Sequence, residues 1–232
     1  MLIGQNELDR IREYRPKIQP EVSLMRASVA IILRDTESGT EFLMMQRAQH
    51  ENDPWSGQMS FPGGKIEPDD ASPRAAAIRE AYEEVGADLS DADLVGQLDD
   101  LYGLKVDGVY SVHVSCFIFK PSKTLSLVGN YEVADMVWLP LSYLHDAANA
   151  HSFTHPLDQA FSMPGVMIDE GKKQILWGLS LRMVMGLYEL LDWPMPVLSE
   201  AQKEILKNIE KREMSRDNVD KITRKIINRG DD

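Results

Sequence analysis

One stretch of the chain, residues 63–87, constrains the fold and the chemistry more than any other. It opens with a glycine pair, continues through an acidic loop and ends in a segment of helical character. Ser72 is a favoured helix N-cap, and Pro73 suits the first helical position, where the missing N–H would be unpaired anyway. Gly86 suits the C-terminal end, because glycine adopts the left-handed conformation there without strain. The pattern predicts a short capped helix over residues 73–85.

The predicted helix divides into an apolar face and an acidic face. At about 100° per residue, the apolar positions from Ala77 to Val85 fall within about 140° of one another, and Glu80, Glu83 and Glu84 gather away from them. Glutamates on a helix face are usually only solvated, but a face built for stability would place lysines at i+4. Hard divalent cations take clusters of oxygen ligands. With the glycine pair, whose backbone can approach a ligand closely, the cluster indicates a metal-dependent phosphate site.

This stretch resembles the Nudix box, Gly-x5-Glu-x7-Arg-Glu-U-x-Glu-Glu-x-Gly-U, in which U is aliphatic. The second half of the box matches from Arg79 to Ala87, with alanines at the aliphatic positions. The first half differs, because Asp70 stands six residues after Gly64, where the box has glutamate, and Arg79 comes one residue late.

The coenzyme A pyrophosphatase-like branch of the Nudix hydrolase family carries the same insertion, and the chain follows its pattern over residues 63–80 with two conservative differences. Residues 57–64 are similar to the Gly-Gln-Val-Ser-Phe-Pro-Gly-Gly signature of that branch, and residues 175–180 to the motif that opens its last helix. The resemblance covers about residues 23–192. It departs at residues 48–55, where the basic run of the branch is missing.

The alternation of apolar runs indicates an α/β chain, and the resemblance implies a Nudix-like α/β/α sandwich with a mixed sheet, followed by a C-terminal helical extension. We expect three parts: an N-terminal segment (1–22), a Nudix hydrolase domain (23–195) and a helical tail (196–232). The expected helices beyond 73–85 cover residues 5–15 and 175–191, and the expected strands cover residues 24–34, 42–46, 58–61, 94–98, 109–119 and 136–139.

The tail carries apolar residues at helical spacing and no proline after residue 198, which predicts one or two amphipathic helices. We expect these helices to pack on their own domain. Pairing of two subunits is the alternative, so a monomer and a homodimer both stay open.

The resemblance implies that Mg²⁺ or Mn²⁺ is held by Glu80, Glu83, Glu84 and the carbonyl oxygen of Gly64. Arg79 would orient the glutamates through charge-assisted hydrogen bonds. Catalytic roles therefore fall to Glu80, Glu84 and Arg79.

Two residues outside the box are further candidates. Many Nudix enzymes place an acidic residue in the loop before a strand such as residues 137–141, and Glu132 stands there. Either Glu132 or Glu80 would take the proton from water, although a solvated loop residue is an equal alternative for Glu132. Arg47 would contact a substrate phosphate by bidentate hydrogen bonds, with a surface salt bridge as the alternative.

The implied reaction is the hydrolysis of the diphosphate bond that joins a nucleoside diphosphate to another moiety, with coenzyme A and its derivatives as candidate substrates. ADP-ribose, a nucleotide sugar or a dinucleotide is the alternative substrate. A non-catalytic ligand sensor is the alternative role, but the four charged box positions are all present, which favours an enzyme.

Charge and composition exclude several other classes. The chain has 25 basic and 37 acidic residues, a net charge of −12, which argues against general binding to nucleic acid or to an anionic membrane. No apolar run approaches the ~18 residues of a membrane span, and no leader is recognisable, so we expect a cytoplasmic protein. Cys116 lies in an apolar run and is expected to be a buried hydrophobe.

Overall fold

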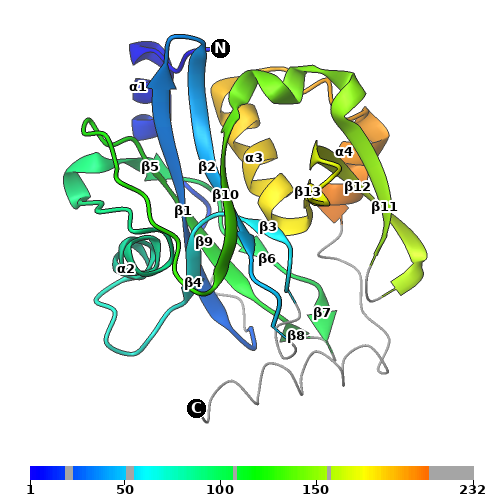
Figure 1. Ribbon diagram of the computed structural model, residues 1–232, viewed down its shortest axis with the longest axis horizontal. Coiled ribbons are helices and arrows are strands. Elements are labelled where there is room, and N and C mark those ends of the chain that lie inside the picture. Colours follow the sequence, from blue (N-terminus) through cyan, green and yellow to red (C-terminus); the bar gives the residue numbers. More distant parts are fainter. Residues whose placement is uncertain (19–22, 51–54, 107–108, 156–157, 209–232) are drawn as a thin grey trace.

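The structure is a computed structural model that describes residues 1–18, 23–50, 55–106, 109–155 and 158–208 (Figure 1). In chain order the helices and strands are α1 (Gln5–Glu13), β1 (Arg26–Thr36), β2 (Gly39–Arg47), β3 (Met59–Ser60), β4 (Gly63–Lys65), α2 (Pro73–Val85), β5 (Leu94–Gln97), β6 (Leu101–Tyr102), β7 (Lys105–Val106), β8 (Val109–Tyr110), β9 (His113–Phe119), β10 (Val133–Pro140), β11 (Ala150–His155), β12 (Asp158–Asp169), β13 (Gln174–Trp177), α3 (Gly178–Leu191) and α4 (Glu200–Asn208).

Within the described residues, eight strands form a mixed sheet in the order β10-β2-β1-β9-β5, with β3 beside β2, β4 beside β1 and β6 beside β9. The central pair β1 and β9 is parallel, in a register that places Val29 opposite Cys116. The other pairs in this sheet are antiparallel. The sheet is therefore mixed, as the family resemblance implies.

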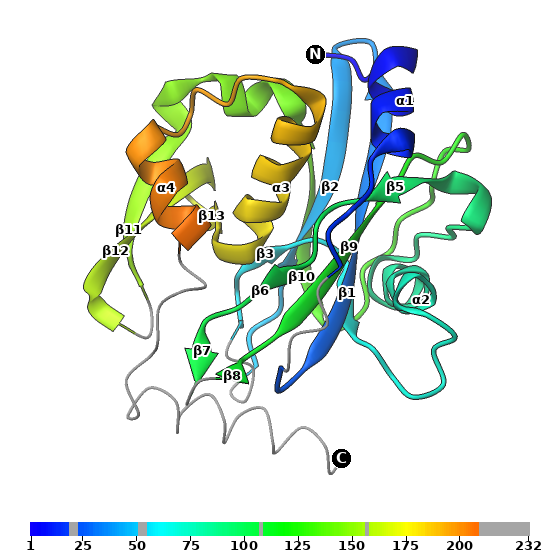
Figure 2. The same ribbon diagram turned by 180° about the vertical axis from the view of Figure 1, so that it is seen from behind.

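Successive residues of the central strands point to opposite faces of the sheet, because the side-chain period of a strand is two. Ala30 and Ile32 pack with α2, whereas Ile31 and Leu33 pack in the cluster that contains α1 and α3. Figures 1 and 2 show α2 on one face of the sheet and α3 on the other. This arrangement confirms the predicted α/β/α sandwich.

A second, three-stranded sheet, β11-β12-β13, was not expected from the sequence, and it lies beside α3 and α4. The predicted helix over residues 175–191 was wrong at its start, because α3 begins only at Gly178. Residues 174–177 are instead a strand, because they pair antiparallel with β12.

The expected strand over residues 109–119 is likewise divided, into β8 and β9. The expected helices over residues 5–15 and 73–85 are confirmed as α1 and α2.

The beginning of the tail packs on the chain's own fold. Helix α4 contacts α3 and β12, its Leu206 is fully buried, and Lys207 forms an ion pair of 2.7 Å with Glu189 of α3. The rest of the predicted tail helices, residues 209–232, lies outside the described residues, so the division into three parts stays a prediction. None of the described helices combines the length and the apolar character that crossing a bilayer would require.

Candidate active site

Helix α2 carries the acidic cluster and is delimited by the residues that the sequence indicates. The Ser72 hydroxyl accepts a hydrogen bond of 3.1 Å from the Ala75 N–H, and Gly86 ends the helix with φ of 68°. Ala77, Ala81 and Val85 are fully buried against the sheet. This contact fixes the rotation of the helix about its axis, which directs the glutamates toward the short strand β4.

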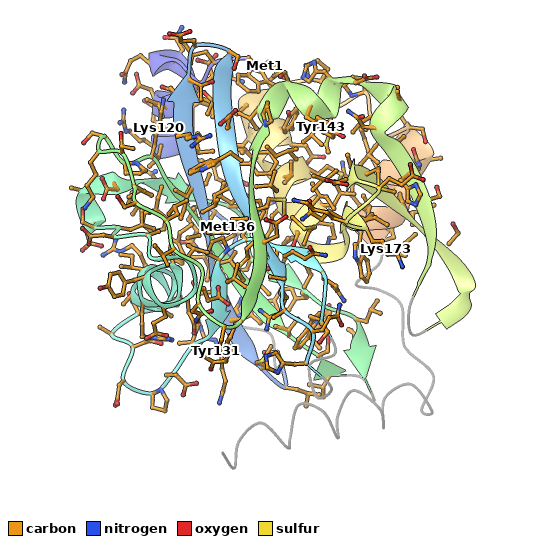
Figure 3. The ribbon with its side chains drawn as sticks, viewed as in Figure 1. Met1, Lys120, Tyr131, Met136, Tyr143 and Lys173 are labelled. Atoms are coloured by element: carbon orange, nitrogen blue, oxygen red, sulfur yellow. The ribbon has the colours of Figure 1, made fainter. Side chains whose placement is uncertain are left out.

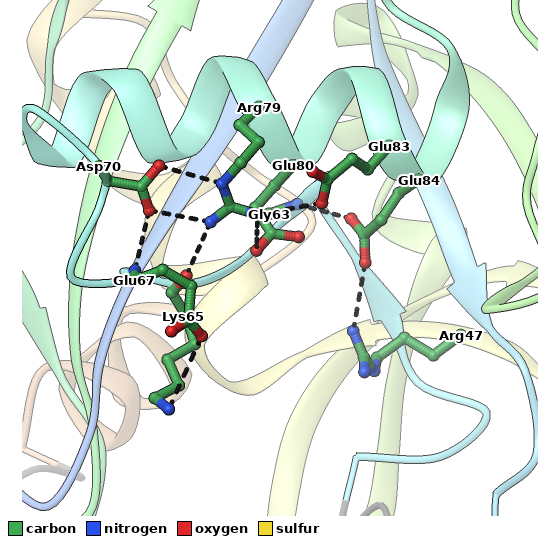
Figure 4. A network of polar contacts seen from close by, with 9 residues as sticks. All are labelled: Arg47, Gly63, Lys65, Glu67, Asp70, Arg79, Glu80, Glu83 and Glu84. Atoms are coloured by element: carbon green, nitrogen blue, oxygen red, sulfur yellow. Dashed lines mark hydrogen bonds and ion pairs between the residues drawn. The ribbon is translucent and has the colours of Figure 1, made fainter. Parts of the chain in front are cut away.

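Strand β4 brings the glycine pair close to Glu80 and Glu84, and Figure 4 shows Gly63 beside the carboxylates. The Gly63 N–H donates a hydrogen bond of 2.8 Å to the Glu84 carboxylate. Gly63 has φ of 153°, and a Cβ there would lie 2.4 Å from the Ser28 carbonyl oxygen. A Cβ on Gly64 would lie 2.7 Å from the carboxylate of Glu80. The positive φ and the backbone contact make glycine necessary at position 63, whereas a side chain at position 64 would displace the Glu80 carboxylate.

Arg79 joins both sides of the site, as Figure 4 shows. It donates two hydrogen bonds to Asp70, from Nε at 3.0 Å and from Nη2 at 2.9 Å, in bidentate geometry. Its Nη1 donates to one oxygen of Glu80 at 2.9 Å and to one oxygen of Glu83 at 3.0 Å. Hydrogen bonding to Asp70 raises the pKa of Arg79, and the same contact lowers the pKa of Asp70. Arg79 therefore stays charged and orients both glutamates.

Glu84 is the most deeply placed carboxylate of the cluster, with a side chain only 3% exposed. Its Oε1 lies 3.7 Å from Nη1 of Arg47, which comes from the end of β2. Burial raises the pKa of Glu84 to about 8, against the opposing effects of the Gly63 N–H and of Arg47. Burial also raises the pKa of Glu80. In both groups burial outweighs the opposing effect of the neighbouring arginine, Arg79 for Glu80 and Arg47 for Glu84, and an added cation would lower both pKa values.

Glu132 lies beside the same cluster. Its negative charge contributes to the raised pKa of both Glu80 and Glu84. The Glu132 carbonyl accepts a hydrogen bond of 2.7 Å from the Ala48 N–H, and the Asn130 N–H donates to the Glu84 carbonyl at 2.8 Å. The loop before β10 is thus attached to α2 and to the residue that follows β2.

The donor set suits a hard divalent cation, although no group of three or more His, Cys, Asp or Glu side chains in the described ranges is arranged as a metal site. Every candidate ligand is an oxygen, the donor type that Mg²⁺ and Mn²⁺ prefer. A carboxylate has two oxygens, and Arg79 engages one on Glu80 and one on Glu83. The assignment of metal ligands stays a prediction.

Asp70 is a site residue that the sequence indicates only as a motif position. Asp70, whose side chain is 6% exposed, anchors Arg79 and also accepts a hydrogen bond of 2.8 Å from the Glu67 N–H. Its position in the inserted box was the available signal. Asp100, another buried carboxylate, is not part of this cluster: it lies 2.8 Å from Nε2 of His113 and accepts a hydrogen bond of 3.0 Å from the Ser115 hydroxyl.

The chain is similar in sequence to several known proteins. The chain is 34% identical over 158 residues to an uncharacterised protein of Schizosaccharomyces pombe, which covers 59% of this chain and 48% of that protein. A probable nudix hydrolase of the same yeast is 31% identical over 59% of this chain and 43% of its own length. The chain thus spans about half the length of these relatives. An uncharacterised Nudix hydrolase NudL of an Enterobacter species is 32% identical over 65% of this chain and 74% of that protein.

Among solved structures, a MutT/nudix family protein from Enterococcus faecalis is 14% identical, with 95% of this chain and 80% of that chain covered at a TM-score of 0.49. The family model of the NUDIX domain matches residues 24–161, more than half of the chain and the part that holds the whole acidic cluster. The chain belongs to the NUDIX family.

Proposed function

We propose that this protein is a divalent-metal-dependent hydrolase that cleaves the diphosphate bond of a nucleoside diphosphate linked to another moiety. One observation carries the proposal: Glu80 and Glu84 face the backbone of a glycine pair, and Asp70 holds the arginine that orients Glu80 and Glu83. Membership of the NUDIX family supports the same chemistry.

Mg²⁺ or Mn²⁺ would be held by Glu80, Glu83, Glu84 and the carbonyl oxygen of Gly64. When bound, such an ion neutralises charge on the diphosphate oxygens and lowers the pKa of a water molecule. The buried Glu84 gains most from a nearby cation, since burial raises its pKa to about 8.

The remaining roles belong to the protein's own groups. Arg79 keeps Glu80 and Glu83 in place, because Asp70 fixes its guanidinium from the opposite side. Either Glu80 or Glu132 accepts the proton of the attacking water, and both lie in the same carboxylate cluster. Arg47, whose side chain is 14% exposed beside Glu84, contacts a phosphate oxygen of the substrate.

Coenzyme A and its derivatives are the substrates that we favour, because the insertion before Arg79 and residues 57–64 follow the coenzyme A pyrophosphatase-like pattern. The segment that lacks the basic run of that pattern includes residues 51–54, which lie outside the described residues. The test is a Mg²⁺- and Mn²⁺-dependent hydrolysis screen of coenzyme A, ADP-ribose, nucleotide sugars, dinucleotides and nucleoside triphosphates. A kcat/KM for ADP-ribose or a nucleotide sugar more than about 10-fold above that for coenzyme A, a difference of about 1.4 kcal/mol, would refute the choice.

The same screen tests the carboxylates directly. We expect Glu83→Gln and Glu84→Gln each to lower turnover at least about 100-fold while the protein stays folded, because each loses a charged ligand. Glu37→Gln, in the exposed turn between β1 and β2, is the matched control and should keep full activity. Near-wild-type turnover of either variant at a moderate Mg²⁺ concentration would refute the assignment of that glutamate as a metal ligand.

A further inference from the structure

The side-chain amide of Gln174 joins the second sheet to the sheet that carries the candidate site. Gln174 is the first residue of β13 and is only 2% exposed. Its Nε2 donates one hydrogen bond of 2.8 Å to Oδ2 of Asp135 on β10 and one of 3.2 Å to Oε1 of Gln46 on β2. An amide nitrogen carries two hydrogens, so this single side chain holds both strands. In Figure 3, Lys173 marks the residue before β13 and Met136 marks β10.

The contact with Gln46 is continued to Arg47, the next residue along β2. Successive strand residues point to opposite faces, so Gln46 reaches Gln174 while Arg47 reaches Glu84. Nε2 of Gln46 also donates to the Gly57 carbonyl at 3.3 Å, and the Gly57 N–H donates to the Arg47 carbonyl at 3.1 Å. The backbone of Arg47 is therefore hydrogen-bonded to a residue that the Gln46 side chain holds in place.

The contact with Asp135 acts on the strand that runs beside Arg47. Asp135 lies opposite Gln46, and the next pair along β10 is Val133 with Arg47, so one residue of β10 is extra and forms a bulge. A bulge leaves the register of a strand dependent on its neighbours. The hydrogen bond from Gln174 to Asp135 thus fixes the register of β10 directly beside Arg47.

Resting on the hydrolase function proposed above, we propose that Gln174 is a positioning residue that holds Arg47 in the orientation in which it binds a substrate phosphate. Bidentate binding of a phosphate by arginine depends on the angle of the guanidinium group, so a small displacement of β2 weakens it. Gln174 lies beyond residues 24–161, the part of the chain that the NUDIX family model matches. The second sheet would therefore contribute to the active site without contacting the substrate.

The kinetic test uses Gln174→Met, which removes the amide and keeps the length of the side chain. With Mg²⁺ and the preferred substrate of the hydrolysis screen, coenzyme A or ADP-ribose, we expect KM to rise about 10-fold and kcat to change less than about twofold. The reason is that Arg47 would contact the phosphate in the ground state and the transition state alike. Gln46→Met breaks the same contact from the other strand and should have the same effect.

Leu176→Val is the matched control in the same strand. Leu176 is fully buried and packs in the apolar cluster with α3, so its truncation weakens the packing of β13 and leaves the Gln174 amide intact. We expect this variant to melt at a lower temperature than the wild type and to keep the wild-type KM. The control therefore separates loss of the amide from loss of stability in β13.

A double-mutant cycle tests whether Gln174 acts through Arg47. In an Arg47→Ala background, Gln174→Met should not raise KM further, because the group that it positions is already absent. An equal rise in KM in both backgrounds would overturn the proposal, because the effect would then be independent of Arg47. A wild-type KM in both Gln174→Met and Gln46→Met would overturn it as well.

NMR tests the positioning without substrate or metal. The Nε–Hε signal of Arg47, assigned by its absence in Arg47→Ala, should show lower order in Gln174→Met and in Gln46→Met, and wild-type order in Leu176→Val. Unchanged order of this group in the folded Gln174 and Gln46 variants would refute the positioning role. The hydrolase function is refuted separately, by the absence of Mg²⁺- or Mn²⁺-dependent hydrolysis of every diphosphate in the screen.

Discussion

Replacing Asp70 by Asn removes the charge that holds Arg79 and keeps the size of the side chain. A fully buried ion pair loses about 3–5 kcal/mol when one partner is removed, and an exposed pair about 0–1 kcal/mol. The side chain of Asp70 is 6% exposed and that of Arg79 30%, and Arg79 keeps its contacts with Glu80 and Glu83. The Asp70–Arg79 pair is intermediate between a fully buried and an exposed ion pair, so we expect Asp70→Asn to lower the free energy of unfolding by about 1–3 kcal/mol.

The assay is urea unfolding of the wild type and Asp70→Asn as a function of pH. Because the contact with Arg79 lowers the pKa of Asp70 in the folded state, its stabilisation is fully present above the unfolded-state pKa of about 3.9. The stabilisation is lost as the pH falls through the lowered, folded-state pKa. The difference between the two proteins should be constant from pH 7 to about pH 5 and should shrink below about pH 4.

Asp69→Asn is the control, because Asp69 precedes Asp70 and is exposed. We expect this control to change the free energy of unfolding by less than about 0.5 kcal/mol. Equal stability of all three proteins at pH 7, or a difference that does not depend on pH in the acid range, would refute the structural role given to the Asp70 carboxylate.

Three further predictions concern the packing around the site. Gly63→Ala should lower the free energy of unfolding by about 2 kcal/mol or more in thermal or urea unfolding, because its Cβ would lie 2.4 Å from the Ser28 carbonyl oxygen. The control is Gly186→Ala inside α3, whose Cβ would lie 3.8 Å from the nearest atom, on Leu98, and which should be neutral or stabilising. Cys116 should react with a thiol reagent only after denaturation, since it is fully buried and burial raises the pKa of its thiol; rapid labelling of the native protein would contradict this. Leu206→Ala should cost about 2 kcal/mol or more, because the side chain is fully buried, and an unchanged melting temperature would show that α4 does not stabilise the fold.

The sequence alone was sufficient for features that depend on near neighbours. The caps Ser72 and Gly86 delimit α2, because capping is a contact between residues a few positions apart. The common direction of Glu80, Glu83 and Glu84 follows from the 3.6-residue period of a helix. The fold class was inferred from the resemblance of the sequence motifs to a known family, and the helices on both sides of a mixed sheet confirm it.

Elements whose local signal is ambiguous could not be predicted in this way. Residues 175–177 are a short apolar run that is compatible with a strand or with the start of a helix, and pairing with β12 makes them part of a strand. Strand β12 itself contains Pro164 and Gly165, which indicate a turn when read locally.

Tertiary structure also decided how three glutamates of one helix differ. The side chain of Glu83 is 52% exposed and that of Glu84 only 3%. Two distant segments cause this difference, since β4 contributes the Gly63 N–H and β2 contributes Arg47. A helical period can place carboxylates on one side of a helix, but burial and the resulting rise in the pKa of Glu84 depend on what the rest of the chain packs against that side.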